Sequence, residues 1–518
     1  MPYPESVSSL NNRLITEELD YDITELQNEL HQLAASLTDE QQGVFNNILT
    51  AVEQKKGGVF FVYGFGGTGK TFLWKTLSTA IRSKGQIVLN VASSGIASLL
   101  LSGGRTAHSR FLIYINLNED SLCSIKPDSD VASLLKKTSL IIWDEAPMVH
   151  MHAFEALDRT LKDILSFDTS GNSNNLFGGK VIVFGGDFRQ ILPVVPNGSR
   201  QDIVNACLSS SYIWSTCKVL RLTKNMRLSC QASNMEQTLM FANWLLDLGE
   251  GKLGDSNDGE SIIDIPEDLL ITNSSDPIKS LIEFVYPSIL QNAKNPSFFF
   301  QERAILAPKN EVVQEIYDRL LSLFPGVYKE YLSSDSLCQS DYIHDDVDEC
   351  LYSHDVLNGL KPSGLPNHKL VLKVGVPVML LRNIDQKSSL CNGTRLWVIS
   401  LGNRVIEVKV ISGNNIGNRT FIPRMSLTPS DKRIPFKFQR RQLPLTVCFA
   451  MTINKSQGQS LSKVGLFFRQ PVFTHGQLYV ALSRVKSRDG LKMVILDNDD
   501  KLTNRTTNVV FKEVVQNL

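Results

Sequence analysis

The sequence has no excess of charge, because its 518 residues include 53 Lys and Arg and 53 Asp and Glu. A net charge of zero neither supports nor excludes a nucleic-acid partner, since a neutral protein can still carry a basic groove. No segment approaches the roughly 18 unbroken apolar residues of a membrane-spanning helix. The N-terminal residues also lack the basic-then-apolar pattern of a signal peptide. We therefore expect an intracellular protein without a membrane partner.

Paired cysteines are also missing, because the eight cysteines are scattered and none forms a CxxC pair. This spacing argues against a zinc site and against a disulfide framework, and it favours a reducing compartment. Hydrophobic residues make up 42% of the chain and charged residues 20%, which is an ordinary globular composition. The length allows several domains, each with its own core.

Apolar runs of strand length alternate with helical stretches from residue 58 to about residue 200. The runs are Val59–Tyr63, Ile87–Ala92, Leu140–Trp143 and Val181–Phe184. This alternation predicts an α/β fold with a parallel sheet that helices cover on both faces. Residues 1–36 have apolar positions at helical spacing and precede this region as a polar helical segment.

A second alternating region begins near Val219 and continues to Met493–Leu496. Two segments interrupt it. Residues 329–369, with an acidic run at 341–349, are rich in Ser, Asp and Gly and are predicted to form a long loop. Residues 390–440 hold short runs of alternating polarity with Gly and Asn between them, which predicts a small barrel or antiparallel sheet.

A phosphate-binding motif follows the first apolar run, since residues 64–71 read GFGGTGKT and fit GxxxxGK[ST]. Glycines let successive backbone N–H groups curve around a phosphate, and the helix start that follows adds its positive end. Lys70 would bridge the β- and γ-phosphates of ATP, and the Thr71 hydroxyl would ligate Mg²⁺. A chance glycine-rich turn is the alternative. The ATP-binding residues predicted here are Gly66, Gly67, Thr68, Gly69, Lys70 and Thr71.

Two carboxylates end the strand-like run that reads LIIWDEAP, and they are Asp144 and Glu145. Ligands bind at the carboxyl ends of strands in open α/β sheets. Asp144 would hold Mg²⁺ through its hydration shell, while Glu145 would orient and deprotonate the attacking water. The alternative is an exposed acidic helix start. The pair favours hydrolysis over transfer to an acceptor.

A third run, VIVFGGDFRQ, places Gln190 after a strand that ends at the same edge. The amide of Gln190 both donates and accepts hydrogen bonds, which suits a sensor of the γ-phosphate or of the attacking water. This pattern is weak when it stands alone.

With these motifs in this order, residues 37–500 resemble the Pif-type (petite integration frequency) DNA helicases of superfamily one, in the form found in plants and Helitron transposons. The segment Ala146–Leu165 resembles that family's signature helix and separates it from the RecD type. The resemblance implies two RecA-like motor domains with an SH3-like β insertion. Its expected parts are 37–215 with a small wedge near 105–130 for the first domain, 216–389 and 441–518 for the second, and 390–440 for the insertion.

The resemblance also assigns residues beyond the phosphate motif. Gln41 matches the glutamine that recognises adenine, and Gly458 lies in a further nucleotide-binding motif. Arg227 and Arg484 match two arginines that reach the γ-phosphate. Both are expected on the second sheet, so that closure of the two domains on ATP would complete the site and drive movement along a DNA strand.

The predicted DNA contacts have weaker support. Ser94 and Gly95 lie where a strand turns into a helix, which suits a backbone contact to a phosphate. His108, Thr452 and Lys455 are assigned by the resemblance alone, and a structural histidine is the alternative for His108. Trp143 and Trp244 lie in apolar runs, so we expect them in the core.

The resemblance implies an ATP- and Mg²⁺-dependent 5′-to-3′ DNA helicase that acts on single-stranded and forked duplex DNA. Roles in DNA repair, recombination and telomere maintenance follow from it, with nuclear residence expected and mitochondria as the alternative. Two other functions stay open, a catalytically idle transposon-derived binder and a RecD-type subunit of a nuclease. The pair His150 and His152 fits the metal motif of a nicking domain but falls inside the signature helix. Arg440 and Arg441 could touch phosphate or be solvated.

Overall fold

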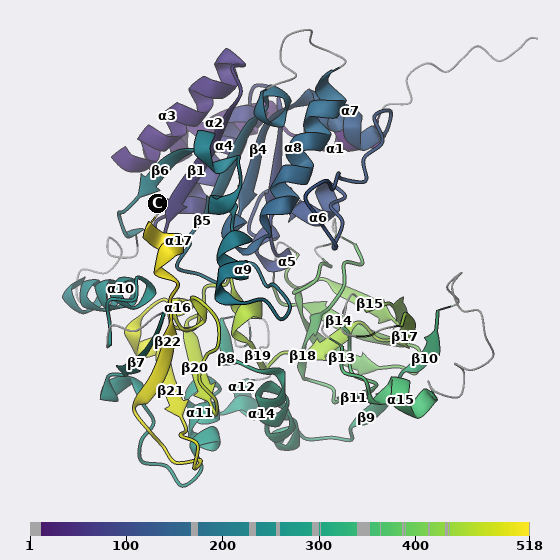
Figure 1. The fold of residues 1–518 in the computed structure, drawn as a ribbon. Helices are drawn as coiled ribbons and strands as arrows, with labels where there is room; N and C mark the ends of the chain where they lie inside the picture. The colour runs from purple at the N-terminus through teal and green to yellow at the C-terminus, as the bar shows by residue number, and fades with distance from the viewer. Residues whose placement is uncertain are drawn as a thin grey trace, which may run out of the picture. The chain divides into compact units, whose positions relative to one another are not determined.

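The computed structural model describes residues 12–516 apart from 167–174, 227–234, 255–258, 293–299, 301, 339–352, 363, 386–387, 389, 413–414, 430–433 and 435. The chain divides into two compact units (Figure 1). The first comprises residues 1–261, 474–479 and 508–518, and the second comprises 262–473 and 480–507.

The first unit contains a six-stranded sheet in the order β3-β2-β4-β5-β1-β6, and neighbouring strands are parallel throughout. The strands are β1 (Gly58–Gly64), β2 (Ile87–Ala92), β3 (Arg105–Thr106), β4 (Thr138–Asp144), β5 (Val181–Gly186) and β6 (Lys218–Leu222). The α/β prediction is therefore confirmed. The four predicted apolar runs lie in β1, β2, β4 and β5.

Helices cover both faces of this sheet (Figure 1). The helices of the first unit are α1 (Arg13–Leu19), α2 (Ile23–Ala35), α3 (Asp39–Gln54), α4 (Lys70–Arg82), α5 (Gly95–Ser98), α6 (Ala107–Arg110), α7 (Asp130–Lys137), α8 (Met151–Ser166), α9 (Arg200–Asn205), α10 (Met235–Gly249) and α17 (Lys512–Gln516). Side chains of α3 and α4 pack in one core with one face of the strands. On the other face Trp143 lies 4.6 Å from Phe154 of α8, measured between ring centroids. Apolar runs without alternation are what burial on two faces requires.

The predicted N-terminal helical segment is present as α1 and α2, and both pack on the first unit. Glu18 of α1 is buried and forms ion pairs with Arg82, at 3.7 Å, and with Arg110. Because a buried carboxylate is tolerated only with such partners, these pairs fix α1 against the sheet domain.

The predicted start of the second domain at residue 216 is wrong. The strand β6 pairs with β1 from Phe60↔Lys218 to Gly64↔Leu222, so it is the edge strand of the first sheet. The first unit accordingly extends to Ser261. An apolar strand at a sheet edge carries no local mark of the sheet that it joins, which is why the pattern misplaced it.

The second unit contains a parallel sheet in the order β19-β8-β20-β21. Its strands are β8 (Arg303–Ala307), β19 (Ala450–Thr452), β20 (Lys463–Phe468) and β21 (Leu491–Ile495), and its helices include α11 (Pro277–Val285), α12 (Ile289–Asn292) and α14 (Asn310–Leu323). The helix α16 (Gln477–Ser483) begins in the first unit and ends in the second. A further two-stranded sheet pairs β7 (Glu260–Asp264) with β22 (Arg505–Val509).

An antiparallel module is inserted between β8 and β19. It has a five-stranded sheet, β15-β14-β13-β12-β18, a three-stranded sheet, β10-β17-β16, and the pair β11-β9. The strands are β9 (Lys329–Leu332), β10 (Ser334–Leu337), β11 (Lys369–Leu372), β12 (Pro377–Leu380), β13 (Arg395–Leu401), β14 (Val405–Val410), β15 (Arg419–Pro423), β16 (Met425–Leu427), β17 (Phe438–Gln442) and β18 (Leu445–Val447).

The prediction of antiparallel strands in 390–440 is confirmed, but the module is wider than predicted. The predicted loop 329–369 is wrong at both ends, since β9, β10, helix α15 (His354–Gly359) and the start of β11 lie in it. These short polar strands have too few apolar residues to be recognised by alternation. The acidic run 341–349 lies outside the described residues.

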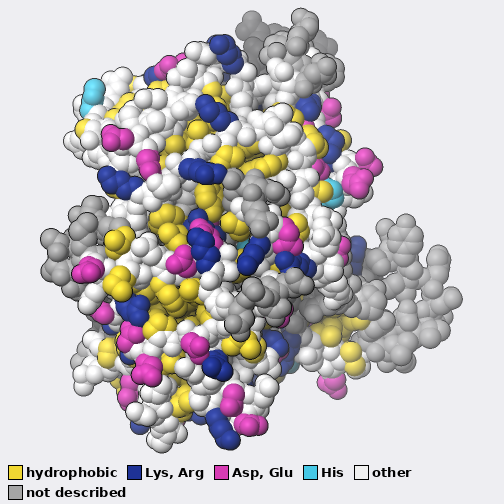
Figure 2. Space-filling view, turned by 60° about the vertical axis from the view of Figure 1, so that its left-hand side comes forward, with side chains coloured by type: hydrophobic (Ala, Val, Ile, Leu, Met, Phe, Trp, Pro, Cys, Tyr) yellow, Lys and Arg dark blue, Asp and Glu magenta, His cyan; other side chains and the backbone are white. Residues whose placement is uncertain are grey.

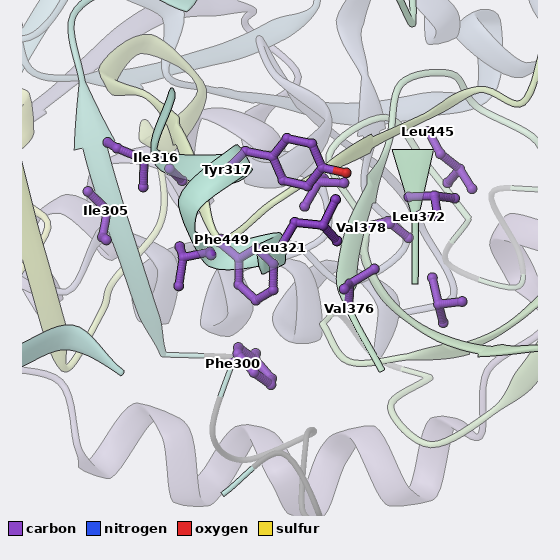
Figure 3. Packing of buried hydrophobic residues seen from close by; sticks show 14 of the residues in the cluster. Phe300, Ile305, Ile316, Tyr317, Leu321, Leu372, Val376, Val378, Leu445 and Phe449 are labelled. Atoms are coloured by element: carbon purple, nitrogen blue, oxygen red, sulfur yellow. The ribbon is translucent and has the colours of Figure 1, made fainter. Parts of the chain in front are cut away.

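One hydrophobic core joins the parallel sheet of the second unit to the antiparallel module (Figure 3). Ile305 of β8 and Phe449 contribute from the parallel sheet side, while Val378 of β12 and Leu445 of β18 contribute from the module. The antiparallel module and the parallel sheet of the second unit therefore pack around the same hydrophobic core.

Arg440 is buried and anchors this module, so the prediction that it touches phosphate or solvent is wrong. Its guanidinium donates to both carboxylate oxygens of Asp335, with Nη2 at 2.6 Å from Oδ2, and to three backbone carbonyls within residues 357–366. Both side chains are 0% exposed. Arg441, the next residue, is exposed.

Candidate functional site

The phosphate-binding loop connects β1 to α4, as predicted. Gly67 and Gly69 have φ values of 104° and 80°, a region that favours glycine. Gly69 immediately precedes Lys70, the first residue of α4. At Gly66 an added Cβ would meet nothing within 4 Å, so this part of the loop leaves room beside its backbone.

The side chain of Gln41, in α3, is hydrogen-bonded to the phosphate-binding loop. Its side chain is 1% exposed, and its Nε2 donates to the carbonyl oxygen of Thr68 at 3.1 Å. Its Oε1 accepts from the backbone N–H of Thr38 at 3.1 Å, as part of a capping box at the start of α3. An added Cβ on Gly69 would clash with the amide nitrogen. The amide thus ties the start of α3 to the phosphate loop.

The Lys70 ammonium folds over the same loop and donates to the carbonyl oxygens of Gly64 and, at 3.5 Å, Phe65. Neutral carbonyls are weaker partners than a phosphate oxygen, so these bonds can be exchanged for an anionic ligand. Thr71 follows with an exposed side chain. The loop therefore presents a cation and a hydroxyl at the N-terminus of α4.

Asp144 ends β4 and is buried, and its Oδ1 has no hydrogen-bond partner among the described residues. Burial raises the pKa of this carboxyl, and the Lys70 ammonium opposes the rise. An isolated buried carboxylate is costly unless a cation compensates it. The unpartnered oxygen, with Lys70 and the Thr71 hydroxyl on the same sheet edge, suits the oxygen ligands that Mg²⁺ prefers.

Glu145 is also buried and adopts a left-handed conformation, with φ 53° and ψ 38°. A residue other than glycine costs roughly 1–3 kcal/mol in such a region, and such residues cluster at functional sites. The chain turns here into the short helix η1 (Ala146–Met148). The strain places the Glu145 carboxyl at the end of β4, one residue after Asp144.

Gln190 follows β5 and is buried, and its Oε1 has no hydrogen-bond partner within the described part of the chain. In the sheet, β5 lies between β4 and β1. Lys70, Asp144 and Gln190 therefore follow the carboxyl ends of three adjacent parallel strands, as the sequence predicted.

In the second unit, Arg484 and the loop at Gly458 lie together. The buried Arg484 guanidinium donates to the carbonyl oxygens of Val480 at 3.0 Å and of Gln459 at 3.2 Å. Gly458 has φ 82°, which suits glycine. Arg227, the other predicted arginine, lies outside the described residues. The strand β6 before it belongs to the first sheet.

The predicted nucleic-acid residues lie at helix starts. Ser94 caps α5, and its Oγ accepts from the N–H of Ala97 at 3.2 Å, while Gly95 is the first residue of that helix. His108 lies in α6, and burial lowers the pKa of its imidazole, which favours the neutral form.

In the second unit, Thr452 ends β19 and Lys455 lies in the short helix η7 (Ile453–Ser456), where the lysine is exposed. Figure 2 shows basic and acidic side chains interspersed on one face of the protein. Charge on this face therefore does not mark a nucleic-acid path.

The tryptophan predictions differ in outcome. Trp143 is fully buried, as predicted, and its Nε1 donates to the hydroxyl of Ser93 at 3.0 Å. Trp244 is only partly buried and stacks on Phe241 with ring centroids 5.9 Å apart.

Within the described part of the chain, His150 and His152 belong to no metal cluster. His152 Nδ1 lies 2.9 Å from a carboxylate oxygen of Glu155 on the same helix. No group of three or more His, Cys, Asp or Glu that could hold a metal ion occurs among the residues that the structure describes. None of the described helices is both long enough and apolar enough to cross a membrane.

Sequence reasoning missed a buried polar cluster beside Gln190. Asp187 and Arg189 flank Phe188 in the run GGDFRQ, and Tyr479 donates to Asp187 Oδ2 at 2.9 Å. The signal was available in part, because two opposite charges directly after a buried strand are unusual unless they are paired. The partner from residue 479 had no local signal.

Three family models match successive parts of the chain. The family model described as PIF1-like helicase matches residues 36–259, that of the 2B domain of DNA helicase Pif1 matches 355–401, and one described as Helicase matches 441–518. The ATP-dependent DNA helicase Pif1 of Bdellovibrio bacteriovorus is 28% identical over 85% of this chain and 85% of its own.

The human ATP-dependent DNA helicase PIF1 is 26% identical over 89% of this chain, which spans 61% of the length of that relative. Among solved structures, Bacteroides Pif1 bound to single-stranded DNA has a TM-score of 0.62 at 24% identity, covering 90% of this chain and 94% of that one. At this identity the structural likeness concerns the fold.

Proposed function

Because the chain belongs to the family of PIF1-like helicases, we propose that it is an ATP-dependent DNA helicase, which translocates along single-stranded DNA and unwinds forked duplexes. The observation that carries this proposal is the edge where Lys70, Asp144 and Gln190 follow adjacent strands, and where a buried carboxylate oxygen of Asp144 has no hydrogen-bond partner among the described residues. Relatives bear the name of ATP-dependent DNA helicase.

The first unit would hold the nucleotide. Backbone N–H groups of residues 66–70 surround the phosphates, and the Lys70 ammonium leaves the loop carbonyls for the β- and γ-phosphates. Thr71 and Asp144 would hold Mg²⁺, which neutralises charge that develops on the phosphates during cleavage. Glu145 orients the attacking water and accepts its proton, while Gln190 contacts the γ-phosphate or that water.

Two arginines would complete the site. Arg484 exchanges its bonds to backbone carbonyls for the γ-phosphate, where an arginine typically supplies about 10³–10⁵ in rate. We keep Arg227 as a second such residue, one that follows a strand of the first sheet. Gln41 and Gly458 would contribute to nucleotide binding.

DNA contacts are proposed at Ser94, Gly95 and His108 in the first unit and at Thr452 and Lys455 in the second. Polarity from 5′ to 3′, roles in repair, recombination and telomere maintenance, and nuclear residence are part of this proposal and rest on the family resemblance.

The test measures phosphate release by the purified chain with and without single-stranded DNA, together with unwinding of 5′-tailed and 3′-tailed duplexes. Stimulation by DNA and a preference for the 5′ tail are expected. Lys70→Ala should abolish both activities, whereas Lys75→Ala, an exposed lysine of the same helix that pairs with Glu29 at 2.6 Å, should leave them unchanged. Strand binding without phosphate release would instead indicate an idle DNA-binding protein, and a preference for the 3′ tail would contradict the polarity.

A further inference from the structure

Two segments far apart in sequence are clasped together beside the nucleotide site. We call residues 187–190 the sensor segment and residues 474–479 the return segment, and both belong to the first unit. His475 Nε2 donates to the carbonyl oxygen of Phe188 at 2.8 Å, and Tyr479 donates to Asp187 Oδ2 at 2.9 Å. The sensor segment ends with Gln190.

Between these two bonds the backbones of the segments meet at Gly476. This glycine has φ 68°, and an added Cβ would fall against the carbonyl oxygen of Arg189 and would lie 2.7 Å from that of Gln190. No side chain fits at this position without moving the sensor segment. The return segment therefore packs directly against the backbone of Gln190.

Arg189 extends the contact to the phosphate loop. Its guanidinium carbon lies 5.3 Å from the ring centre of Tyr63, at the end of β1, and 5.9 Å from that of Phe65, within the loop. Its Nη2 lies 3.4 Å from Glu250, and its Nε lies 3.9 Å from Asp187. Cation–π contacts of a desolvated guanidinium are favourable, so Arg189 links the sensor segment to the loop.

Buried polar groups make this arrangement specific. Asp187 is 0% exposed and also accepts from the backbone N–H of Arg189 at 3.1 Å, while the N–H of Gln190 donates to the Asp187 carbonyl at 3.0 Å. Removing the Tyr479 hydroxyl would leave a buried carboxylate oxygen without that donor, a penalty that the sensor segment can relieve only by moving. The Gln190 Oε1, without a partner among the described residues, does not hold the side chain in place by itself.

We propose that Tyr479, His475 and Gly476 form a clamp that positions Gln190 for ATP hydrolysis, with Arg189 linking the clamp to the phosphate loop. This inference rests on the proposed ATPase function, since it assigns positioning residues to the same site. The clamp residues contact the sensor segment, so they should affect turnover more than nucleotide affinity.

The test compares Tyr479→Phe with Tyr212→Phe. Tyr212 is a matched control, because its hydroxyl also donates to a buried carboxylate of the first unit, Asp158 Oδ2, at 2.7 Å. For Tyr479→Phe we expect kcat of the DNA-stimulated ATPase to fall about tenfold, while KM for ATP stays within about twofold. For Tyr212→Phe we expect both constants to match the wild type. Equal turnover in the two variants, whether normal or reduced, would overturn the clamp.

A second measurement keeps the clamp testable without turnover. Hydrogen exchange should speed up at the amides of 189 and 190 in Tyr479→Phe and in Gly476→Ala, but not in Tyr212→Phe, because the N–H groups of both residues bond to Asp187. Unchanged exchange at these amides would also overturn the clamp. If the wild type lacks ATPase activity while exchange responds as expected, the proposed function fails and the clamp stands as a structural device.

Discussion

Replacing Gln41 by Ala should weaken binding of ATP and GTP alike. The substitution removes the bond from Nε2 to the Thr68 carbonyl and the bond from the Thr38 N–H to Oε1, each 3.1 Å long. A buried carbonyl that loses its partner costs about 2 kcal/mol, within the usual range for such groups. If this penalty falls on the loop conformation that binds phosphate, the Kd of either nucleotide rises about 30-fold.

The assay is a titration with fluorescent analogues of ATP and GTP in the presence of Mg²⁺. Gln41→Glu separates the two bonds, because a carboxylate still caps the Thr38 N–H but cannot donate to the Thr68 carbonyl. This variant should lose nearly as much affinity as Gln41→Ala. Gln42→Ala is the control, since the side chain of this half-buried neighbour bonds only Asn46 among the contacts described, at 2.9 Å.

The outcome distinguishes two roles of Gln41, which are to hold the phosphate-binding loop in place and to recognise the adenine base. Each end of the Gln41 amide keeps one further hydrogen-bonding position, so contact with adenine is compatible with the brace. A brace lowers affinity for both nucleotides. If GTP binding is unchanged while ATP binding falls, Gln41 acts on the base alone and the reasoning from the loop contacts is refuted.

Three further results are expected. Glu145→Gln should bind ATP normally but release phosphate about 10²–10⁴ times more slowly. A wild-type rate of phosphate release in a single-turnover experiment would contradict the role of Glu145 as the base. Burial lowers the pKa of His475 from 6.5 to about 4, so its contribution to stability is complete above pH 6.5 and is lost as pH falls toward 4. At pH 5 the stability lost is about 2 kcal/mol. The difference in urea midpoint between wild type and His475→Gln should therefore change between pH 7.5 and pH 5. A constant difference would contradict the lowered pKa of His475. Arg440→Leu leaves the buried Asp335 without its ion-pair partner and should lower the free energy of unfolding by about 3–5 kcal/mol. Arg441→Leu, at an exposed position, should change the free energy of unfolding little in the same measurement. Equal effects of the two variants would refute the anchoring role of Arg440.

The parts of the first sheet that carry chemistry were predictable because their signals are local. Strands buried on two faces are continuously apolar, and a glycine loop between such a strand and a helix start has few other uses. The same applies to Asp144, since a carboxylate directly after a buried strand lies at the sheet edge wherever the rest of the chain goes. Local pattern and topology therefore agree at this edge.

The braces around this edge were not predictable, because each one joins residues that are distant in sequence. Gln41 bonds the carbonyl of Thr68 across 27 positions, and Tyr479 bonds Asp187 across 292. The spacing of Thr38 and Gln41 marks a helix start, but no neighbour of either donor marks its distant acceptor. Their roles become visible only when the fold places buried donors beside buried acceptors.

The strand before Arg227 shows where an alternating pattern stops being informative. The run in β6 has the apolar residues of a parallel strand, and such a strand can pair with any exposed sheet edge of matching direction. The pairing of Leu222 with Gly64 places its carboxyl end beside the strand that leads into the phosphate loop. Arg227, five residues later, lies outside the described residues, so its approach to a phosphate stays a prediction. The other predicted arginine, Arg484, lies in the second unit, so the pattern and the fold agree at that position.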